Sequence, residues 1–295
     1  IVVGQIASIK NIARCVEQSE LKVGDITLEP LASAAAVLAE EEKDAGVVLV
    51  DIGGGTTDIA IFKDSIIRHT AVIPFGGKVI TEDIKEGCEI IEKQAETLKI
   101  KFGSAWPGEN KENEIVSIPG LRGRPPKEIS LKTLSKIINA RVREIMESVI
   151  AEIRNYQQND PRKRLIAGIV LTGGGSQLKH MGQLVEYLTG MPTRIGYPNE
   201  HLASGYAKEL ASPVYATSIG LLSMALETTP HTMAYDPTET DAPFVEAEAE
   251  AKEVQEEEGS PTQTGSTKAP PRKDPFWKGF ITNIKDWLEN DEDVE

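Results

Sequence analysis

The sequence contains little cysteine and no long apolar run. Its two cysteines, Cys15 and Cys88, form no CxxC pair and belong to no Cys/His cluster. This excludes a disulfide framework and a zinc site, and it favours a reducing compartment. No uninterrupted apolar run of about 18 residues occurs, so the sequence predicts no membrane-spanning helix. The chain starts at Ile1 without the segments of a signal peptide, and we expect it to be a fragment whose N-terminal part is missing.

Basic residues are also in deficit, and the deficit is unevenly distributed. The net charge is −14, and the segment between Pro230 and Pro270 holds ten acidic residues against two basic ones. More than half of the net charge therefore belongs to one segment, and the rest of the chain is only mildly acidic. Because the sequence has no basic patch, we expect no nucleic-acid partner.

Strand-like and helix-like patterns alternate over residues 1–226, which indicates an α/β fold. The run GVVLVDIG predicts a buried strand, because it is too apolar for a strand with one wet face. IVVGQIA predicts another strand, TDIAIFKDSIIRHTAVIPFGG two more, and PLASAAAVLAEEEKD one buried helix. The run from Val79 to Gly103 predicts one long helix or two. Residues 104–129 predict an irregular excursion with one short strand, and Ser130 is expected to cap a helix that runs to about Gln157.

The pattern of a folded core ends near Thr228. Residues 228–273 are rich in Pro, Thr, Glu and Ala, and such a composition predicts a disordered acidic linker. Residues 274–290 regain helical periodicity and predict an amphipathic helix that inserts into a membrane surface. The alternative is a helix docked on its own domain. The apolar arc of this helix consists of Phe276, Trp277, Phe280, Ile281, Ile284, Trp287 and Leu288.

The first glycine turn, Gly53-Gly54-Gly55, joins one strand to another. This excludes a Rossmann or Walker site, in which the glycines lead into a helix. Several backbone N–H groups of such a turn can point at one anion, and Thr56 and Thr57 add hydroxyl groups. Asp51 and Asp58 can hold a hydrated Mg²⁺ or orient a water molecule. The alternative is a tight hairpin that uses glycine only for its positive φ.

The second glycine turn, Gly173-Gly174-Gly175-Ser176, is expected to lead from a buried strand into a helix. The N-terminus of a helix favours negative charge and the close approach of a ligand. The alternative is a strand–helix junction in which glycine serves only close packing. Taken together, the two turns predict a nucleotide site that is split between distant parts of the chain.

The motifs carry a resemblance to a known family. The series DIGGGTTD, PFGG, AETLK and LTGGGS resembles the actin/Hsp70/sugar-kinase ATPase superfamily, and within it the FtsA family of bacterial cell-division proteins. EPLASAAAVL, GRPPKEI and VYATSIGLL fall in that family's order. The resemblance implies an α/β fold of actin-like (ribonuclease H-like) lobes, with mixed sheets flanked by helices. It assigns 1–47 to the first lobe, 48–227 to the second lobe with an inserted subdomain at about 90–164, 228–273 to the linker and 274–290 to a membrane-targeting helix.

The resemblance also implies ATP and Mg²⁺ as cofactors. The second phosphate loop would be formed by Gly53, Gly54, Gly55, Thr56 and Thr57. Asp51 would lie near the attacking water and hold Mg²⁺ through water. The adenosine and α-phosphate would lie against Gly173, Gly174, Gly175 and Ser176. The ribose and adenine would be reached by Glu96 and Lys99, whose alternative is a surface i,i+3 ion pair. Close backbone approach would be allowed by Gly76 and Gly77, which otherwise form a plain turn.

One part of the family's pattern is missing from this chain. The first phosphate loop and a small inserted subdomain, which precede Ile1 in the family, are absent. We therefore expect this chain alone to bind ATP weakly or not at all, and hydrolysis to be slow at most.

The resemblance further implies partners and a location. The exposed side chain of Arg141 would bind a carboxylate of the C-terminal tail of the tubulin-like protein FtsZ. The alternative for Arg141 is an ordinary solvated residue of a helix. Further partners would be copies of the protein itself in a filament, an anionic membrane surface and other divisome proteins. The location would be the cytoplasmic face of the cell membrane at the division septum. The alternatives are a PilM-type pilus-assembly homologue and an Hsp70-like ATPase.

Overall fold

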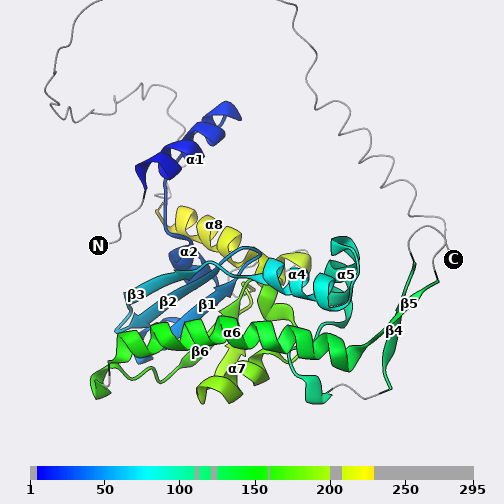
Figure 1. Cartoon of the computed structure of the whole chain (residues 1–295). Helices are drawn as coiled ribbons and strands as arrows, with labels where there is room; N and C mark the ends of the chain where they lie inside the picture. The colour runs from blue at the N-terminus through cyan, green and yellow to red at the C-terminus, as the bar shows by residue number, and fades with distance from the viewer. Residues whose placement is uncertain (1–4, 110–112, 121–124, 159, 200–207, 229–295) are drawn as a thin grey trace, which may run out of the picture. The chain divides into compact units, whose positions relative to one another are not determined.

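A five-stranded mixed sheet forms the centre of the computed structural model (Figure 1). The structure describes residues 5–109, 113–120, 125–158, 160–199 and 208–228. The strand order is β3-β2-β1-β6-β7. The strands are β1 (Val47–Ile52), β2 (Thr57–Lys63), β3 (Ile66–Ile73), β6 (Gly168–Thr172) and β7 (Thr193–Ile195).

The pairing of the strands brings the two glycine turns to one edge of the sheet. β1, β2 and β3 pair in an antiparallel manner, whereas β1–β6 and β6–β7 are parallel. β1 leads into the first glycine turn and β6 into the second, and Asp51 lies opposite Thr172 in their register. Because neighbouring parallel strands end at the same edge, both turns lie there.

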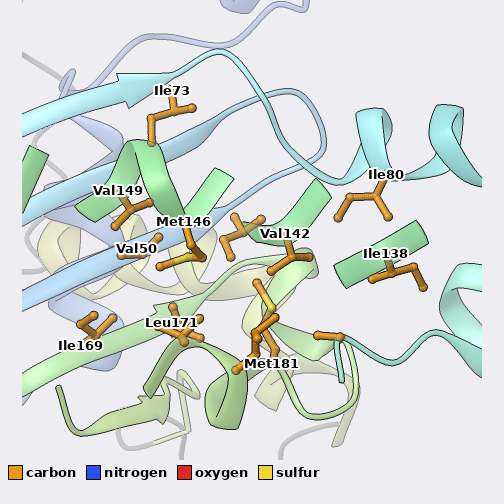
Figure 2. Close-up of a cluster of buried hydrophobic side chains, with 14 of the residues drawn as sticks. Val50, Ile73, Ile80, Ile138, Val142, Met146, Val149, Ile169, Leu171 and Met181 are labelled. Carbon is orange, nitrogen blue, oxygen red and sulfur yellow. The ribbon is translucent and has the colours of Figure 1, made fainter. Parts of the chain in front are cut away.

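Helices cover both faces of the sheet. The alternation of β1 sends Val48, Val50 and Ile52 into one apolar cluster and Val47 and Leu49 into the other. The first cluster is closed by α4 (Gly77–Gly87), α5 (Glu92–Phe102), α6 (Leu131–Gln157) and α7 (Met181–Thr189). The second cluster is closed by α2 (Glu29–Val37) and α8 (Ala216–Thr228). Figure 2 shows Val142, Met146 and Val149 of α6 beside Val50, Ile169 and Leu171 of the sheet.

The remaining elements differ from the sequence predictions at two places. They are α1 (Ile6–Gln18), α3 (Glu40–Ala45), β4 (Ile115–Ile118), β5 (Lys127–Ser130) and the 3₁₀ helices Pro107–Glu109, Pro161–Lys163, Gly174–Gln177, Lys208–Ala211 and Pro213–Tyr215. A strand was expected over IVVGQIA, but its described part opens α1. One short strand was expected in 104–129, but β4 pairs with β5 in a hairpin.

The single helix predicted for PLASAAAVLAEEEKD is in fact two helices. α2 ends at Val37, and the next residue, Leu38, has an extended backbone and a buried side chain. The backbone N–H of Ala39 donates to Glu42 Oε2 at 3.0 Å, which starts α3. Three glutamates in the first turn of α3 favour a new helix N-terminus at this position. The apolar periodicity alone did not reveal this break.

A glycine sets the distance between α2 and α8. A Cβ atom at Gly220 would lie 1.7 Å from the carbonyl oxygen of Ala32, so the two helix backbones approach as closely as glycine allows. This contact places Ser33 of α2 beside Thr217 of α8, with 2.9 Å between their hydroxyl oxygens.

Within the described residues, no helix is both long and apolar enough to span a bilayer. The predicted linker 228–273 lies outside the described residues except for its first residue, and the predicted helix 274–290 lies wholly outside them. The proposed division into 1–47, 48–227 and 90–164 stays a prediction. Helix α6, which falls within 90–164, packs on the same core as β1 and β6.

Candidate functional site: a pocket between two glycine turns

A pocket of about 390 Å³ joins the two glycine turns. Seven of the residues predicted to bind nucleotide line it: Gly53, Gly54, Gly77, Glu96, Lys99, Gly174 and Gly175. Gln177 and four apolar residues also line it: Ile80 of α4, Ile100 of α5, Leu178, and Val214 of the 3₁₀ helix Pro213–Tyr215. An apolar wall beside convergent polar groups is typical of small-molecule sites.

The glycines of the first turn are not required by the backbone. None of Gly53, Gly54 and Gly55 has a positive φ, so the alternative that glycine serves only for positive φ is wrong. A Cβ atom at Gly54 or Gly55 would meet no atom within 4 Å. Neither the conformation nor the packing of the described residues therefore requires glycine at positions 54 and 55.

The amide groups of the first turn share one orientation. The carbonyls of Gly53 and Gly54 accept hydrogen bonds at 2.8 Å from the backbone N–H groups of Gly77 and Lys78, at the start of α4. In a trans peptide the N–H points opposite to the preceding carbonyl. The N–H groups of Gly54 and Gly55 therefore point away from α4, and they donate to no acceptor among the described residues.

The two threonines of the first turn use their hydroxyl groups within the protein. Thr56 Oγ1 donates to Asp58 Oδ2 at 2.9 Å. Thr57 is buried, and its Oγ1 donates to the carbonyl of Phe75 at 2.8 Å. This second bond holds the loop that contains Gly76, at which a Cβ atom would lie 2.6 Å from the carbonyl oxygen of Gly53. Gly76 therefore serves close packing against the first turn.

The second turn packs against the end of β1. Gly173 has φ +78°, and a Cβ atom there would lie 2.3 Å from Asp51 Oδ1. A Cβ atom at Gly175 would lie 2.3 Å from Ile52 Cγ2, whereas at Gly174 the nearest atom would be 3.8 Å away. Gly173 and Gly175 are thus required by packing, and Gly174 is open towards the pocket.

The sequence predicts that the second turn leads directly into an α-helix, and this prediction is wrong. It leads into the 3₁₀ helix Gly174–Gln177, and α7 begins at Met181 after His180, which has φ 62°. Ser176 causes this tight turn, because its buried hydroxyl donates to the carbonyl of Gly173 at 2.7 Å. The N-terminus of α7 is therefore separated from the glycines, and the hydroxyl of Ser176 is engaged inside the turn.

Glu96 and Lys99 form more than a surface ion pair. Lys99 Nζ lies 2.8 Å from Glu96 Oε2 and also donates to the carbonyl of Gly77 at 2.9 Å. The buried hydroxyl of Thr81 accepts from Lys99 Nζ at 2.7 Å and donates to Glu96 Oε2 at 2.5 Å. Burial raises the pKa of Glu96, but the bonds from Lys99 and Thr81 outweigh it and lower the pKa. Thr81 was not predicted as a site residue, because no local pattern in the sequence marks it.

Asp51 is buried in a cluster of carboxylates. Its side chain is 6% exposed and accepts a hydrogen bond from Ser33 Oγ at 2.9 Å. Burial raises its pKa, the bond from Ser33 opposes this rise, and the charge of Asp58 adds to it. Burial, followed by the charges of Asp58 and Asp51, also raises the pKa of Glu29. Glu29 and Ser33 lie in EPLASAAAVL, which the sequence analysis used only for the resemblance.

The carboxylate cluster fits Mg²⁺ through water better than by direct contact. Oxygen ligands suit Mg²⁺, which keeps several of its waters. A cation would offset the burial, and after it the mutual repulsion, that raise the pKa of Asp51 and Glu29. Among the described residues, no group of three or more His, Cys, Asp or Glu side chains has the arrangement of a direct metal site.

Arg141 is less exposed than the sequence analysis assumed. Its side chain is 23% exposed, and its guanidinium is bonded to Asp83 of α4 and to Glu144 one turn along α6. Asp83 lies 58 residues earlier in the chain, so helical periodicity could not reveal this pair. The residues predicted to bind the membrane, from Phe276 to Leu288, lie outside the described residues.

The sheet order, the helix layers and the two glycine turns define an actin-like protein, and solved structures agree. A chain of MreB5 of Spiroplasma citri bound to ADP is similar with a TM-score of 0.60 and 20% identity, over 77% of this chain and 69% of that one. A chain of a MamK double helical filament is similar with a TM-score of 0.58 and 16% identity, over 77% of this chain and 66% of that one. At these identities the likeness shows the fold.

The family follows from sequence similarity. The family model described as Cell division protein FtsA matches residues 48–220, and this chain belongs to that family. The cell division protein FtsA of Neisseria meningitidis serogroup B is 40% identical over 225 residues, which are 76% of this chain and 53% of that protein. The chain spans about half the length of the curated relatives it matches.

Proposed function

We propose that this chain is part of an actin-like cell-division protein that binds ATP with Mg²⁺ at its two glycine turns. The observation that carries the proposal is the pair Gly54 and Gly55. Their conformation and packing do not require glycine, and their N–H groups point to the open side of the turn. The close approach of an anion explains both features, because a Cβ atom would obstruct it. The similar structure of MreB5 is bound to ADP, which supports a nucleotide as the anion.

In this proposal each part of the pocket has a separate task. The amides of the first turn hold the phosphates, while Asp51, Asp58 and Glu29 orient the waters around Mg²⁺. Mg²⁺, when bound, supplies positive charge that offsets the phosphates. Gly174 gives the adenosine close access to the second turn. Glu96 and Lys99, fixed by Thr81, lie on the wall of the pocket where the ribose and adenine are placed. Hydrolysis is at most slow, and the protein acts mainly as an adaptor.

A glycine substitution tests the nucleotide site. Gly54→Ala is expected to weaken ATP binding about tenfold without lowering thermal stability, because the new Cβ atom meets no atom of the described residues but lies in the path of the phosphates. Saturation-transfer NMR at millimolar ATP measures weak binding of this kind.

Gly182→Ala is the matched control for this test. Gly182 lies in α7, and its added Cβ atom would also meet nothing within 4 Å. This variant should bind ATP as the wild type does. Equal ATP signals from Gly54→Ala and Gly182→Ala would contradict the proposal.

The family and the fold also support a place in the division machinery. We propose that the protein forms filaments, binds the C-terminal tail of FtsZ at Arg141 and contacts other divisome proteins. It would lie on the cytoplasmic face of the cell membrane at the septum, held at the anionic surface by the apolar arc from Phe276 to Leu288. The description of the similar MamK structure as a filament supports self-assembly. Membership of the FtsA family disfavours the PilM-type and Hsp70-like alternatives.

A further inference from the structure

Helix α4 presents a carboxylate to the arginine on α6. Arg141 Nε donates to Asp83 Oδ2 at 2.5 Å, and Arg141 Nη2 donates to Asp83 Oδ1 at 2.8 Å. This bidentate geometry is the strongest arrangement of an arginine and a carboxylate. Both side chains are about three-quarters shielded from water. The pair is therefore stronger than an ordinary ion pair on an open surface.

Further acidic residues surround the same guanidinium. Arg141 Nη1 donates to Glu144 Oε2 at 2.6 Å. The pKa of Arg141 is raised, chiefly by the hydrogen bonds that Arg141 donates to Asp83 and further by the charges of Asp83, Glu144 and Glu82, against an opposing effect of burial. The positive charge of the Arg141 guanidinium thus lies among the negative charges of Asp83, Glu144 and Glu82. Of the five N–H groups of the guanidinium, three are engaged.

Helix α4 holds Asp83 in a fixed position. The backbone N–H groups of Gly77 and Lys78 donate to the first glycine turn, and the hydroxyl of Thr81 bonds to Lys99 and Glu96 of α5. The apolar side of α4, with Ile80 and Ile84, is buried in the same core as Ile138 of α6 (Figure 2 labels Ile80 and Ile138). Because the helix is held at its start and along its buried side, the carboxylate of Asp83 is preorganised against Arg141.

We propose that Asp83 is an internal competitor for the partner's carboxylate at Arg141, and that it determines how tightly and how selectively this surface binds a peptide. The proposal rests on the proposed role of Arg141. A peptide with a single carboxylate exchanges one ion pair for another and meets a locally negative surface, so it gains little from Arg141. The surface therefore selects peptides that add apolar contacts or use the two guanidinium N–H groups that have no acceptor among the described residues.

The experiment removes the competitor and leaves the arginine in place. Asp83→Asn keeps the shape of the side chain but removes its charge. Its affinity for a fluorescent peptide with the FtsZ tail sequence is expected to be about three- to tenfold higher than that of the wild type, measured by anisotropy with residues 1–295. Asp83→Ser is a second neutral variant. Circular dichroism checks that each variant is folded.

Two controls separate this inference from the proposed function. Glu86→Gln removes a negative charge from α4 at an exposed residue that has no hydrogen bond or ion pair to Arg141, and should leave the affinity unchanged. Arg141→Gln should weaken binding. If it does, but Asp83→Asn and Asp83→Ser bind no more tightly than the wild type, the internal competitor is refuted while the partner role stands. If Arg141→Gln has no effect, or no variant binds the peptide, both ideas are wrong.

Discussion

Asp51 is the residue at which the needs of the fold and of the proposed site differ most. Its carboxylate is buried beside Asp58, and a Cβ atom at Gly173 would lie 2.3 Å from its Oδ1. The hydrogen bond from Ser33 compensates only in part, because the pKa of Asp51 remains raised. A buried carboxylate with a raised pKa is typical of functional sites, where a charged group is kept for a ligand at the expense of stability.

We expect Asp51→Asn to stabilise the protein at neutral pH. A carboxyl group with a raised pKa binds its proton more tightly in the folded state, so its contribution to stability falls as pH rises from its unfolded pKa through its folded pKa. Removing the charge should raise the thermal midpoint by about 2–4 °C at pH 7. The difference should shrink as pH falls and disappear below the ordinary pKa of an aspartate.

The measurement for this prediction is a series of thermal melts of wild type and variant across pH. Asp44→Asn, which removes an exposed carboxylate of α3, is the control and should leave the midpoint nearly unchanged at each pH. A variant that is less stable than the wild type at pH 7 would show that the charge of Asp51 stabilises the fold. Asp51→Asn should also lose Mg²⁺-dependent ATP binding.

Among the secondary-structure elements, the packed pair α2 and α8 positions the side chain that hydrogen-bonds to Asp51 of the carboxylate cluster. Gly220 allows the two helix backbones to meet, and this contact brings Ser33 and Thr217 to one hydrogen-bonded position under Asp51. Neither helix shows a strong apolar stripe of its own. The close approach of the backbones therefore does more for this packing than large side chains do.

Gly220→Ala is expected to destabilise the protein by about 1–3 kcal/mol, because overpacking forces the two helices apart. Its Cβ atom would lie 1.7 Å from the carbonyl oxygen of Ala32, which no rotamer change can relieve. Urea unfolding measures the loss. Gly182→Ala in α7 has the opposite expectation, a gain of up to about 1 kcal/mol, because alanine favours helix and this site is open. Equal effects of the two substitutions would contradict the packing argument.

At the scale of the whole molecule, the described residues include a five-stranded actin-like sheet with two helix layers and a separate hairpin of β4 and β5, and the chain continues to residue 295. The chain spans about half the length of the curated relatives it matches. In the filament proposed above, the weak membrane contacts of many copies would add up to strong attachment through avidity.

Membrane attachment is predicted to depend on the apolar arc of residues 274–290. Ile284→Glu places a charge in the middle of that arc and should abolish most co-sedimentation with anionic vesicles. Thr282→Glu adds the same charge on the predicted polar side and should lower it only modestly. Neutral vesicles should retain much of the binding, because basic and acidic residues nearly cancel in this segment. Equal sedimentation of both variants would refute insertion of the arc.

The sequence by itself determined the features that depend on local periodicity and composition. The strands around Val50 and Ile59, the long helix from Leu131 to Gln157 and the two glycine turns were all predicted at their observed positions. Each of these signals lies within a few consecutive residues, because side-chain alternation and turn chemistry are local properties. The break at Leu38 and the second strand of the hairpin were missed because they depend on packing and pairing rather than on periodicity.

Only the tertiary structure decided which of these features meet. Parallel pairing of β1 with β6 brings Gly54 and Gly174 to the same pocket. The hydroxyl of Thr81 accepts a hydrogen bond from Lys99, and Asp83 of α4 accepts one from Arg141 of α6. These contacts join residues that are far apart in the sequence, and the chain path, not the local pattern, brings them together. For the same reason the positive-φ interpretation of the first turn could be rejected only once its backbone and its empty surroundings were known.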